Sequence, residues 1–353
     1  MAATPNEIYH HLEQRIVGQK DCKEKLSILG YLFSLKLEMI KHNYPDTDLP
    51  KLNAMLIGPT GSGKTEMAFQ LAEYLNVPFI RVDCTSITPT GYAGNDIEDF
   101  LQNLKYQLRD AGSPGIIILD EFDKLGKGKD SSSSGNFHEN TQASLLDLLD
   151  SRYCADVHFG KHDSFASQER DRQLVNNSLI ILSGALDHLF NNDKPSTTLS
   201  PGFIGAPIKT EVDVIKWREL LVKEGVMPEI VSRIVSICKT EKLTKDEIKQ
   251  LLTEKKGSAL AKYYNLLPTV EVTMEDIDKL SESVHNSKFG IRDLEGKIFD
   301  LIQSKLLERI DITYYPQFDP EEQDPLALVC TPEDLFYLEY STDNNEEPPK
   351  DEN

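Results

Sequence analysis

The sequence contains no long uncharged apolar run of the kind that a membrane-spanning helix requires. Its first residues, MAATPNEIYHHLEQ, lack a basic segment followed by an apolar core, so we expect no secretory signal. The five cysteines are scattered without a CxxC pair, which argues against a disulfide framework or a cysteine zinc site. These absences predict a cytoplasmic protein that works in a reducing compartment and does not enter a membrane.

A basic stripe is missing as well. The net charge is −20, and residues 319–353 carry −11 of it, from twelve acidic residues and one lysine, which leaves −9 on residues 1–318. A mildly acidic body has no attraction for a phosphate backbone, so broad nucleic-acid binding is disfavoured.

What is present is an alternation of apolar runs and helical patterns. Short apolar runs predict buried strands at 52–57, 78–83, 115–121 and 178–183. Apolar residues at helical spacing predict helices at 19–42, 64–75 and 95–111, the last capped by Asn95 and Asp96. Such alternation is typical of an α/β domain with a doubly wound parallel sheet, which we expect over residues 12–235.

The pattern changes after this domain. Residues 236–318 show mainly helical spacing with at most one or two short strands, which predicts a small α-helical domain. Residues 319–353 are acidic and dotted with proline, and we expect a disordered tail with one apolar island at 335–340. Two polar stretches, at 126–140 and 190–210, predict long loops, and loops of that length are usually functional.

A glycine-rich motif follows the first predicted strand. Gly58–Thr65 reads GPTGSGKT, with an apolar strand before it and a helical pattern after it. Glycines let backbone N–H groups curl around phosphate, and the helix N-terminus adds partial positive charge. In such a loop Lys64 reaches the β- and γ-phosphates, and Thr65 holds Mg²⁺. The motif in this context predicts a site for ATP and Mg²⁺.

A pair of carboxylates supplies a second half of the site. In IIILDEFDK, Asp120 and Glu121 emerge at the carboxyl end of the third predicted strand, the edge where ligands bind in open α/β sheets. We expect Asp120 to hold Mg²⁺ through water, and Glu121 to orient and deprotonate the attacking water. Together with the phosphate loop, this pair indicates hydrolysis of ATP and not mere binding.

Phosphoryl transfer also requires positive charge close to the reacting phosphate. Arg233 in VMPEIVSRI and Arg292 in KFGIRDLEGK are two candidates, and spacing alone does not separate them from ordinary surface arginines.

Taken together, the motifs from about residue 12 to 310 resemble the AAA+ superfamily, and specifically the ClpX/HslU branch of protein unfoldases. RIVGQ is similar to the family's opening box, in which Ile16 and Val17 would contact adenine. The phosphate loop and its continuation, GPTGSGKTEMA, match nearly letter for letter. The matched positions are Gly58, Pro59, Thr60, Gly61, Ser62, Gly63, Lys64, Thr65 and Glu66.

Further segments carry the resemblance along the chain. ILSGAL resembles the sensor-1 strand, with Ser183 as the polar sensor. MPEIVSRI resembles the arginine-finger segment, which implies that Arg233 reaches the nucleotide of a neighbouring subunit. FGIR resembles the sensor-2 box, which implies that Arg292 contacts the nucleotide of its own chain. A site completed in trans implies a ring, normally a homo-hexamer.

The resemblance also implies a protein substrate. TGYAGNDIEDFL is similar to the first pore loop and the helix after it, so Gly91, Tyr92, Ala93 and Gly94 would form an aromatic grip on a threaded polypeptide. FGKHD resembles the basic loop at the pore entrance, in which Lys161 and His162 match. The 126–140 loop lies where the second pore loop is expected.

Some family features differ. The chain starts almost at the AAA+ core and lacks the cysteines of the N-terminal zinc-binding domain, so substrate recognition by that domain is not expected. The stretch at 126–140 is too short for the inserted helical domain of the HslU branch. The protease-docking loop of ClpX carries an aliphatic-Gly-Phe tripeptide, whereas PGFIGAP here places Phe203 before Ile204 and Gly205. Docking on a ClpP-like protease ring is therefore an open alternative.

Three function classes share such motifs: an ATP-driven protein unfoldase and translocase, a nucleic-acid remodelling motor of the helicase or clamp-loader type, and a nucleotide switch or scaffold with little hydrolysis. A motor or chaperone that remodels a specific protein or nucleoprotein complex without a protease partner is the alternative to the first. The Tyr92 segment favours the first. The missing basic charge argues against a nucleic-acid motor, and Glu121 argues against a switch with little hydrolysis.

Overall fold

The computed structural model describes residues 3–45, 49–88, 95–126, 135–150, 165–186, 217–253, 259–266, 272–287 and 289–307. Its centre is a five-stranded parallel sheet in the order β2-β5-β6-β1-β7. The strands are β1 (Asn53–Ile57), β2 (Phe79–Asp83), β5 (Ile116–Asp120), β6 (Leu179–Gly184) and β7 (Ser236–Lys239). The parallel α/β fold predicted from the sequence is confirmed.

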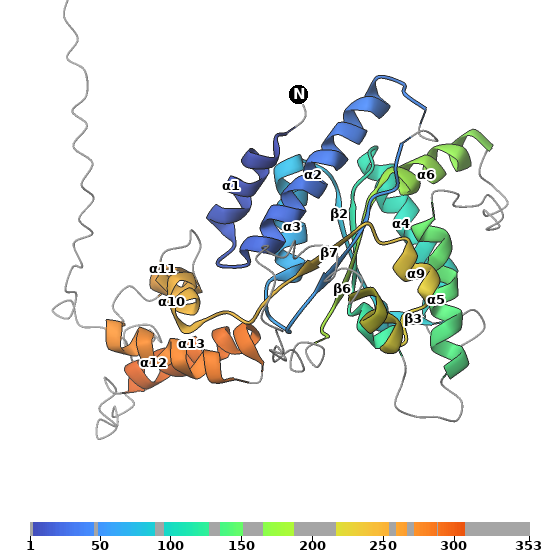
Figure 1. The fold of residues 1–353 in the computed structure, drawn as a ribbon. Helices are drawn as coiled ribbons and strands as arrows, with labels where there is room; N and C mark the ends of the chain where they lie inside the picture. The colour runs from blue at the N-terminus through green and yellow to red at the C-terminus, as the bar shows by residue number, and fades with distance from the viewer. Residues whose placement is uncertain are drawn as a thin grey trace, which may run out of the picture.

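Helices cover both faces of the sheet (Figure 1). One face packs against α1 (Pro5–Arg15), α2 (Lys20–Lys41) and α3 (Lys64–Leu75). The other packs against α4 (Ile97–Ala111), α5 (Gly135–Leu149) and the short α9 (Pro228–Ser232), and α6 (Phe165–Asn177) lies beside α4. The chain therefore winds around the sheet in both directions, as doubly wound folds do.

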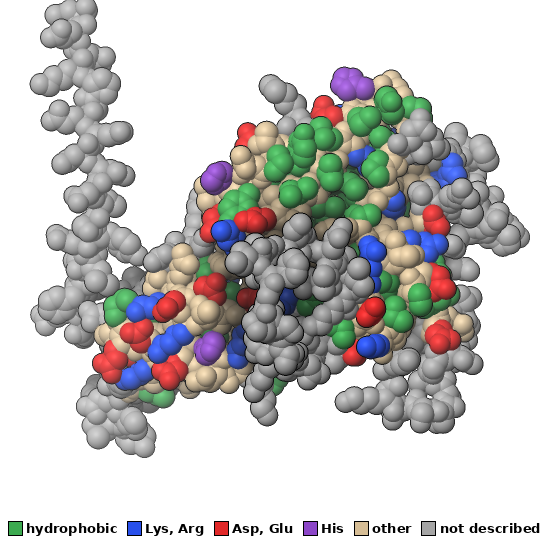
Figure 2. Space-filling view, in the orientation of Figure 1, with side chains coloured by type: hydrophobic (Ala, Val, Ile, Leu, Met, Phe, Trp, Pro, Cys, Tyr) green, Lys and Arg blue, Asp and Glu red, His purple; other side chains and the backbone are tan. Residues whose placement is uncertain are grey.

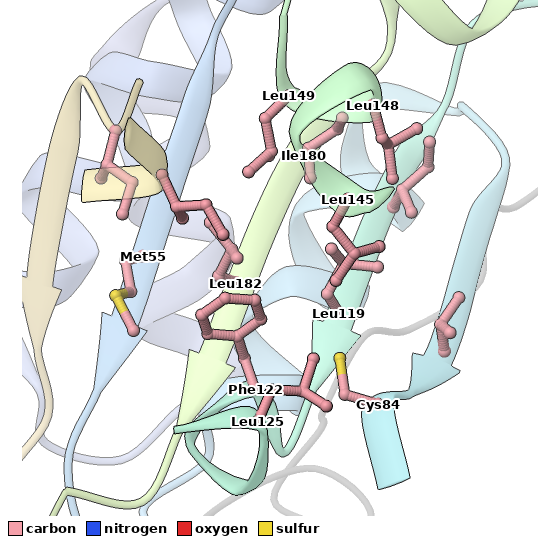
Figure 3. Packing of buried hydrophobic residues seen from close by; sticks show 14 of the residues in the cluster. Met55, Cys84, Leu119, Phe122, Leu125, Leu145, Leu148, Leu149, Ile180 and Leu182 are labelled. Atoms are coloured by element: carbon pink, nitrogen blue, oxygen red, sulfur yellow. The ribbon is translucent and has the colours of Figure 1, made fainter. Parts of the chain in front are cut away.

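Alternate residues of each strand pack in the two apolar clusters, one on each face of the sheet, because successive side chains of a strand point to opposite faces. In β1, Met55 and Ile57 join the cluster under α4 and α5, whereas Ala54 and Leu56 join the cluster under α1–α3. Figure 3 shows the first cluster, in which leucines of α5 lie against side chains from β1, β5 and β6. Because β5 is buried on both faces, its sequence is apolar up to Asp120 at its carboxyl end.

A separate apolar cluster joins the remaining helices (Figure 1). These are α10 (Lys245–Thr253), α11 (Ala259–Leu266), α12 (Met274–Asn286) and α13 (Leu294–Leu307), with the 3₁₀ turn η4 (Gly290–Asp293) before α13. Their core includes Ile248, Leu280 and Ile298, each almost fully buried. This cluster is the small helical unit that the sequence predicted.

The structure departs from the predicted division between the two units. The boundary was expected at 235/236, but β7 pairs with β1 from Ala54↔Ser236 to Ile57↔Lys239 and is a strand of the large sheet. Residues 236–239 therefore belong to the large unit. That unit also begins before residue 12, because Ile8 of α1 is fully buried in its core.

Two local expectations also change. Asn95 and Asp96 were expected to cap a helix, but they form β4 (Asn95–Asp96), which pairs with β3 (Ile87–Thr88), and α4 starts at Ile97. The predicted 126–140 loop ends early, since α5 starts at Gly135. The predicted tail, 319–353, lies outside the described residues. Within the described ranges every helix is too short or too polar to cross a membrane.

Candidate active site

The phosphate loop connects the carboxyl end of β1 to the N-terminus of α3. Gly58 needs to be glycine, because an added Cβ would lie 2.1 Å from Thr240 Oγ1 and 2.3 Å from the Thr240 carbonyl oxygen. Ser62 and Thr240 share a hydrogen bond of 2.6 Å, so the loop is fixed to the end of β7. The amino group of Lys64 donates to the carbonyl oxygens of Gly58 and Pro59, each at 2.8 Å. The loop thus curls around its own lysine at the start of a helix.

Asp120 ends β5 beside this loop. Its Oδ2 accepts a hydrogen bond from Thr65 Oγ1 at 3.1 Å, and its Oδ1 accepts one from the Glu121 N–H at 3.1 Å. Arg81 of β2 donates to Oδ2 from Nε at 3.0 Å and from Nη2 at 2.8 Å. The carboxylate is buried and fully engaged, and it shares one oxygen between the hydroxyl and the guanidinium.

Glu121 follows in a left-handed backbone conformation with φ of 54°. Such a conformation is uncommon for a residue with a side chain, and it occurs where the surroundings hold it in place. The 3₁₀ turn η3 (Phe122–Leu125) that comes next is anchored by Phe122, whose ring is fully buried in the core. Backbone strain at this position agrees with a functional carboxylate.

Several carboxylates lie together at the carboxyl ends of β2 and β5. Burial is the main cause that raises the pKa of the Cys84 thiol, and the neighbouring carboxylates Asp83, Asp120, Asp123 and Glu121 raise it further. A concentration of carboxylates at one edge attracts a divalent cation. Carboxylate and hydroxyl oxygens are also the ligands that Mg²⁺ prefers.

Ser183 lies next to Asp120. The β5–β6 register pairs Leu119 with Leu182, so the following residues, Asp120 and Ser183, are neighbours at the carboxyl edge. Ser183 is fully buried, and its Oγ has no hydrogen-bond partner among the described residues. A buried hydroxyl without a partner is costly, and such a group is uncommon outside sites that bind a water, an ion or a ligand.

The small helical unit approaches the phosphate loop from the other side. An added Cβ on Gly61 would lie 3.1 Å from the Ile291 nitrogen and 3.4 Å from the Arg292 nitrogen. A narrow pocket lies between the loop and the helical unit, lined by Thr60, Ser62 and Ile248 among others. Arg292 is thus held at the phosphate loop of its own chain, on η4.

Ile16 and Val17 are both buried at the end of α1, and Ile16 packs in the core beneath α1–α3. Gln19 forms two hydrogen bonds with the backbone of Glu241, accepting from its N–H at 2.8 Å and donating to its carbonyl at 2.7 Å. The last residue of the opening box is therefore fixed to the connection between the two units. Glu66 is exposed on α3 and accepts a bond from Gln70.

Arg233 lies at the amino ends of the strands, on the side of the sheet away from the phosphate loop. Its carbonyl oxygen accepts a hydrogen bond of 3.2 Å from Asn53 Nδ2, at the start of β1. Its guanidinium donates to Asp150 Oδ2 at 3.1 Å and to the Glu229 carbonyl at 2.8 Å. The five residues of β1 separate Arg233 from the phosphate loop, roughly 16 Å at the rise of an extended strand.

The remaining predicted site residues lie outside the described residues. These are Gly91, Tyr92, Ala93 and Gly94 of the predicted grip, Lys161 and His162 of the predicted entrance loop, and Phe203, Ile204 and Gly205 of the predicted docking loop.

Sequence reasoning missed Arg81 and Thr240. Arg81 has a signal that could have found it: it is a cation in a short strand, FIRVD, two residues before the strand's carboxyl end. Thr240 has none, because its role depends on β7 pairing with β1. Lys64, Thr65, Asp120 and the Ser183 hydroxyl together fit a nucleotide and its Mg²⁺ by the chemistry of their donors and acceptors.

Comparison with known proteins agrees with this geometry. Residues 54–172 match the family described as "ATPase family associated with various cellular activities (AAA)". The chain is 30% identical over 321 residues to the ATP-dependent Clp protease ATP-binding subunit ClpX of Borrelia duttonii, covering 86% of this chain and 74% of the relative. It is 29% identical over 327 residues to the protein of the same name from Bacteroides thetaiotaomicron, covering 86% and 77%. The ClpX 2 protein of Wolinella succinogenes is 28% identical over 315 residues, with the same coverage.

The fold, the phosphate loop and the carboxylate pair define an ATPase of the AAA class. Within that class, the chain belongs to the ClpX family of AAA+ ATPases. The resemblance stated from the sequence motifs is thereby confirmed at the level of the family, and so is the prediction that the protein is an ATPase.

Proposed function

We propose that this protein is an ATP-driven unfoldase and translocase that works as a homo-hexameric ring and threads polypeptide through its centre. The observation that carries the proposal is the separation of Arg233 from the phosphate loop of its own chain. An arginine at the far edge of the sheet cannot complete its own site, but it can complete the site of the next subunit in a ring. The similarity to ClpX subunits over 86% of the chain supports the same conclusion.

The chain's own groups divide the work of hydrolysis. Lys64 leaves the loop carbonyls to bind the phosphates, and the N–H groups at the start of α3 complete the cradle. Bound Mg²⁺, held by Thr65 and Asp120, would neutralise charge on the phosphate oxygens. Glu121 accepts the proton of the attacking water, Ser183 orients that water or the γ-phosphate, and Arg292 contacts the phosphates from the helical unit. In GTPases a supplied arginine raises the rate by ~10³–10⁵, and we assign that role to Arg233 in trans.

An exposed apolar strip on α2 supports assembly. Ile28, Leu32 and Met39 are exposed by 55%, 44% and 36%, and their spacing brings them to one side of the helix. Figure 2 shows apolar side chains gathered in this region of the surface. Contiguous apolar patches on a protein surface commonly mark contact with another protein.

The gripping role is assigned to Tyr92. The described strands on either side of its segment, β3 and β4, pair through Ile87↔Asn95 and Thr88↔Asp96. The start and the end of the segment are thus held next to each other, on the side of the sheet that bears α4. Contact between one aromatic side chain and an extended polypeptide contributes only ~2 kcal/mol of binding free energy. Several subunits that bind the same polypeptide together hold it more tightly.

The grip is tested by Tyr92→Ala, with Tyr106→Ala as the matched control because Tyr106 is a 68% exposed tyrosine on the surface of α4. Both variants should hydrolyse ATP within about twofold of the wild type, since the proposed grip acts on the substrate chain and not on the nucleotide. Only Tyr92→Ala should fail to unfold a fluorescent substrate protein. Normal unfolding by Tyr92→Ala would contradict the proposed grip.

A remodelling motor without a protease partner is the second candidate. The order of Phe203, Ile204 and Gly205 differs from the aliphatic-Gly-Phe tripeptide of protease-docking loops, which favours release of the unfolded product. Sedimentation of the protein with and without a ClpP-type protease ring, in the presence of ATP, separates the two candidates. Co-sedimentation that Phe203→Ala abolishes would support docking.

A further inference from the structure

Arg81 forms an ion pair with Asp120, the carboxylate that the proposed magnesium site requires. It lies on β2, the strand at the edge of the sheet, and reaches across to Asp120 of the neighbouring strand β5. Nε and Nη2 of Arg81 approach the same oxygen, Oδ2, at 3.0 and 2.8 Å. That oxygen also accepts the Thr65 hydroxyl at 3.1 Å. The guanidinium and the Thr65 hydroxyl therefore both bind the oxygen that a cation held between Thr65 and Asp120 would need.

Burial explains why Asp120 needs a counter-charge. The Asp120 side chain is only 7% exposed, and a buried carboxylate without a cation is costly. In the nucleotide-free protein Arg81 provides the positive charge. An arginine stays protonated at every physiological pH, so this contact is ended only by displacement and not by loss of a proton.

The two side chains of this ion pair differ in how freely they can move. The Arg81 side chain is 53% exposed, whereas Asp120 is fixed by the Glu121 N–H and by its place at the end of a central strand. Arg81 can move into solvent at a small cost, because exposed ends of ion pairs are well hydrated. Asp120 cannot move in the same way.

We propose that Arg81 is a displaceable counter-ion of Asp120 that competes with Mg²⁺ for this carboxylate. It balances the charge of Asp120 and holds the side chain in position while the site lacks nucleotide, and it moves out when Mg²⁺ enters with the nucleotide. Arg81 is on this account a positioning residue that sets how much Mg²⁺ the protein needs. The inference rests on the proposed nucleotide site.

The test is a titration of Mg²⁺ at a fixed concentration of fluorescent ADP, with nucleotide binding as the readout. Arg81→Met removes the competing charge at similar length, so the Mg²⁺ concentration for half-maximal binding should fall about fivefold. Arg81→Lys keeps a charge but loses the two-nitrogen contact, and should give a decrease of about twofold. The Arg81→Lys variant also tests the proposal if the Arg81→Met variant fails to fold. An unchanged or higher Mg²⁺ requirement in both variants would overturn the proposal.

The matched control is Arg109→Met, which removes another pairing of a half-exposed arginine with a buried aspartate, Asp171, away from the phosphate loop. Its Mg²⁺ requirement should equal that of the wild type. An equal decrease in the Arg109 variant would indicate a general effect of lost charge, and would overturn the specific role of Arg81.

Thermal unfolding gives an independent readout. Without nucleotide and with a chelator, Arg81→Met should unfold at a lower temperature than the wild type, and Mg²⁺ with ADP should reduce that difference. A difference that persists unchanged would mean that Arg81 is structural in both states, and would overturn the proposal. If the wild type bound no nucleotide at any Mg²⁺ concentration, the proposed function would fail and this inference with it. Nucleotide binding with an unchanged Mg²⁺ requirement would overturn only the inference.

Discussion

The two serines at the ends of β6 should respond in opposite ways to the same substitution. Ser183 and Ser178 are both buried, but only Ser178 is satisfied: its Oγ accepts the Gly115 N–H at 3.0 Å and donates to the Leu174 carbonyl at 2.8 Å. The Ser183 hydroxyl has no partner among the described residues. A buried hydroxyl without a bond costs about 1–3 kcal/mol, and removing it recovers much of that cost. Ser183→Ala should therefore stabilise the nucleotide-free protein by about 1 kcal/mol, and Ser178→Ala should destabilise it by about 1–3 kcal/mol.

The assay is thermal unfolding of both variants without nucleotide, followed by ATPase measurements. Ser183→Ala should have a higher unfolding temperature and a much lower ATPase rate, because it lacks the hydroxyl that we propose orients the attacking water or the γ-phosphate. Ser178→Ala should have a lower unfolding temperature and a normal rate at a temperature where it is folded. If Ser183→Ala destabilised the protein as much as Ser178→Ala, the Ser183 hydroxyl would be satisfied without nucleotide and the reasoning would be refuted.

Two further predictions concern the helical unit and its contact with the phosphate loop. Gly61 and Gly63 both have positive φ, but a Cβ on Gly63 meets nothing within 4 Å, whereas one on Gly61 lies 3.1 Å from a backbone nitrogen of η4. Gly61→Ala should therefore lower the free energy of unfolding by about 1 kcal/mol more than Gly63→Ala, as measured without nucleotide, and equal losses would contradict this contact. Burial alone would raise the pKa of Asp276, but hydrogen bonds from Lys305 and Thr273 outweigh it and lower the pKa from 3.8 to about 2. The stability that this pair contributes, at most about 2 kcal/mol, is present above pH 3.8 and lost as pH falls toward 2. Asp276→Asn should therefore make the acid unfolding of the protein less steep, as followed by circular dichroism.

The sheet and the phosphate loop were predictable because their signals are local. β5 and β6 are buried on both faces, so each begins with four apolar residues and turns polar only near its carboxyl end, and the parallel sheet can be predicted from sequence. The loop Gly58–Thr65 curls between β1 and α3, and its glycines permit that backbone path, with positive φ at Gly58, Gly61 and Gly63. Motif and structure agree here because backbone geometry determines the residue types.

The features that sequence reasoning missed depend on contacts between distant segments. The four residues of β7 carry no strong pattern, and only the pairing with β1 makes them a strand of the sheet. The contact of Arg81 with Asp120 depends on the register of β2 on β5, which no local pattern encodes. The start of α5 at Gly135 was hidden by the serine- and glycine-rich composition before it.

The central claim is that each ATPase site is completed by the Arg233 of a neighbouring subunit. The most direct measurement mixes two inactive variants, Glu121→Gln and Arg233→Ala, in equal amounts under conditions that let rings exchange subunits. A site in an Arg233→Ala subunit still has Glu121 and can receive the intact arginine of a Glu121→Gln neighbour. Random assembly should then restore about a quarter of the wild-type ATPase activity per subunit, since that share of neighbouring pairs has both groups intact. If Arg233 acted within its own chain, every subunit would lack one group, and the mixture would stay as inactive as either variant alone.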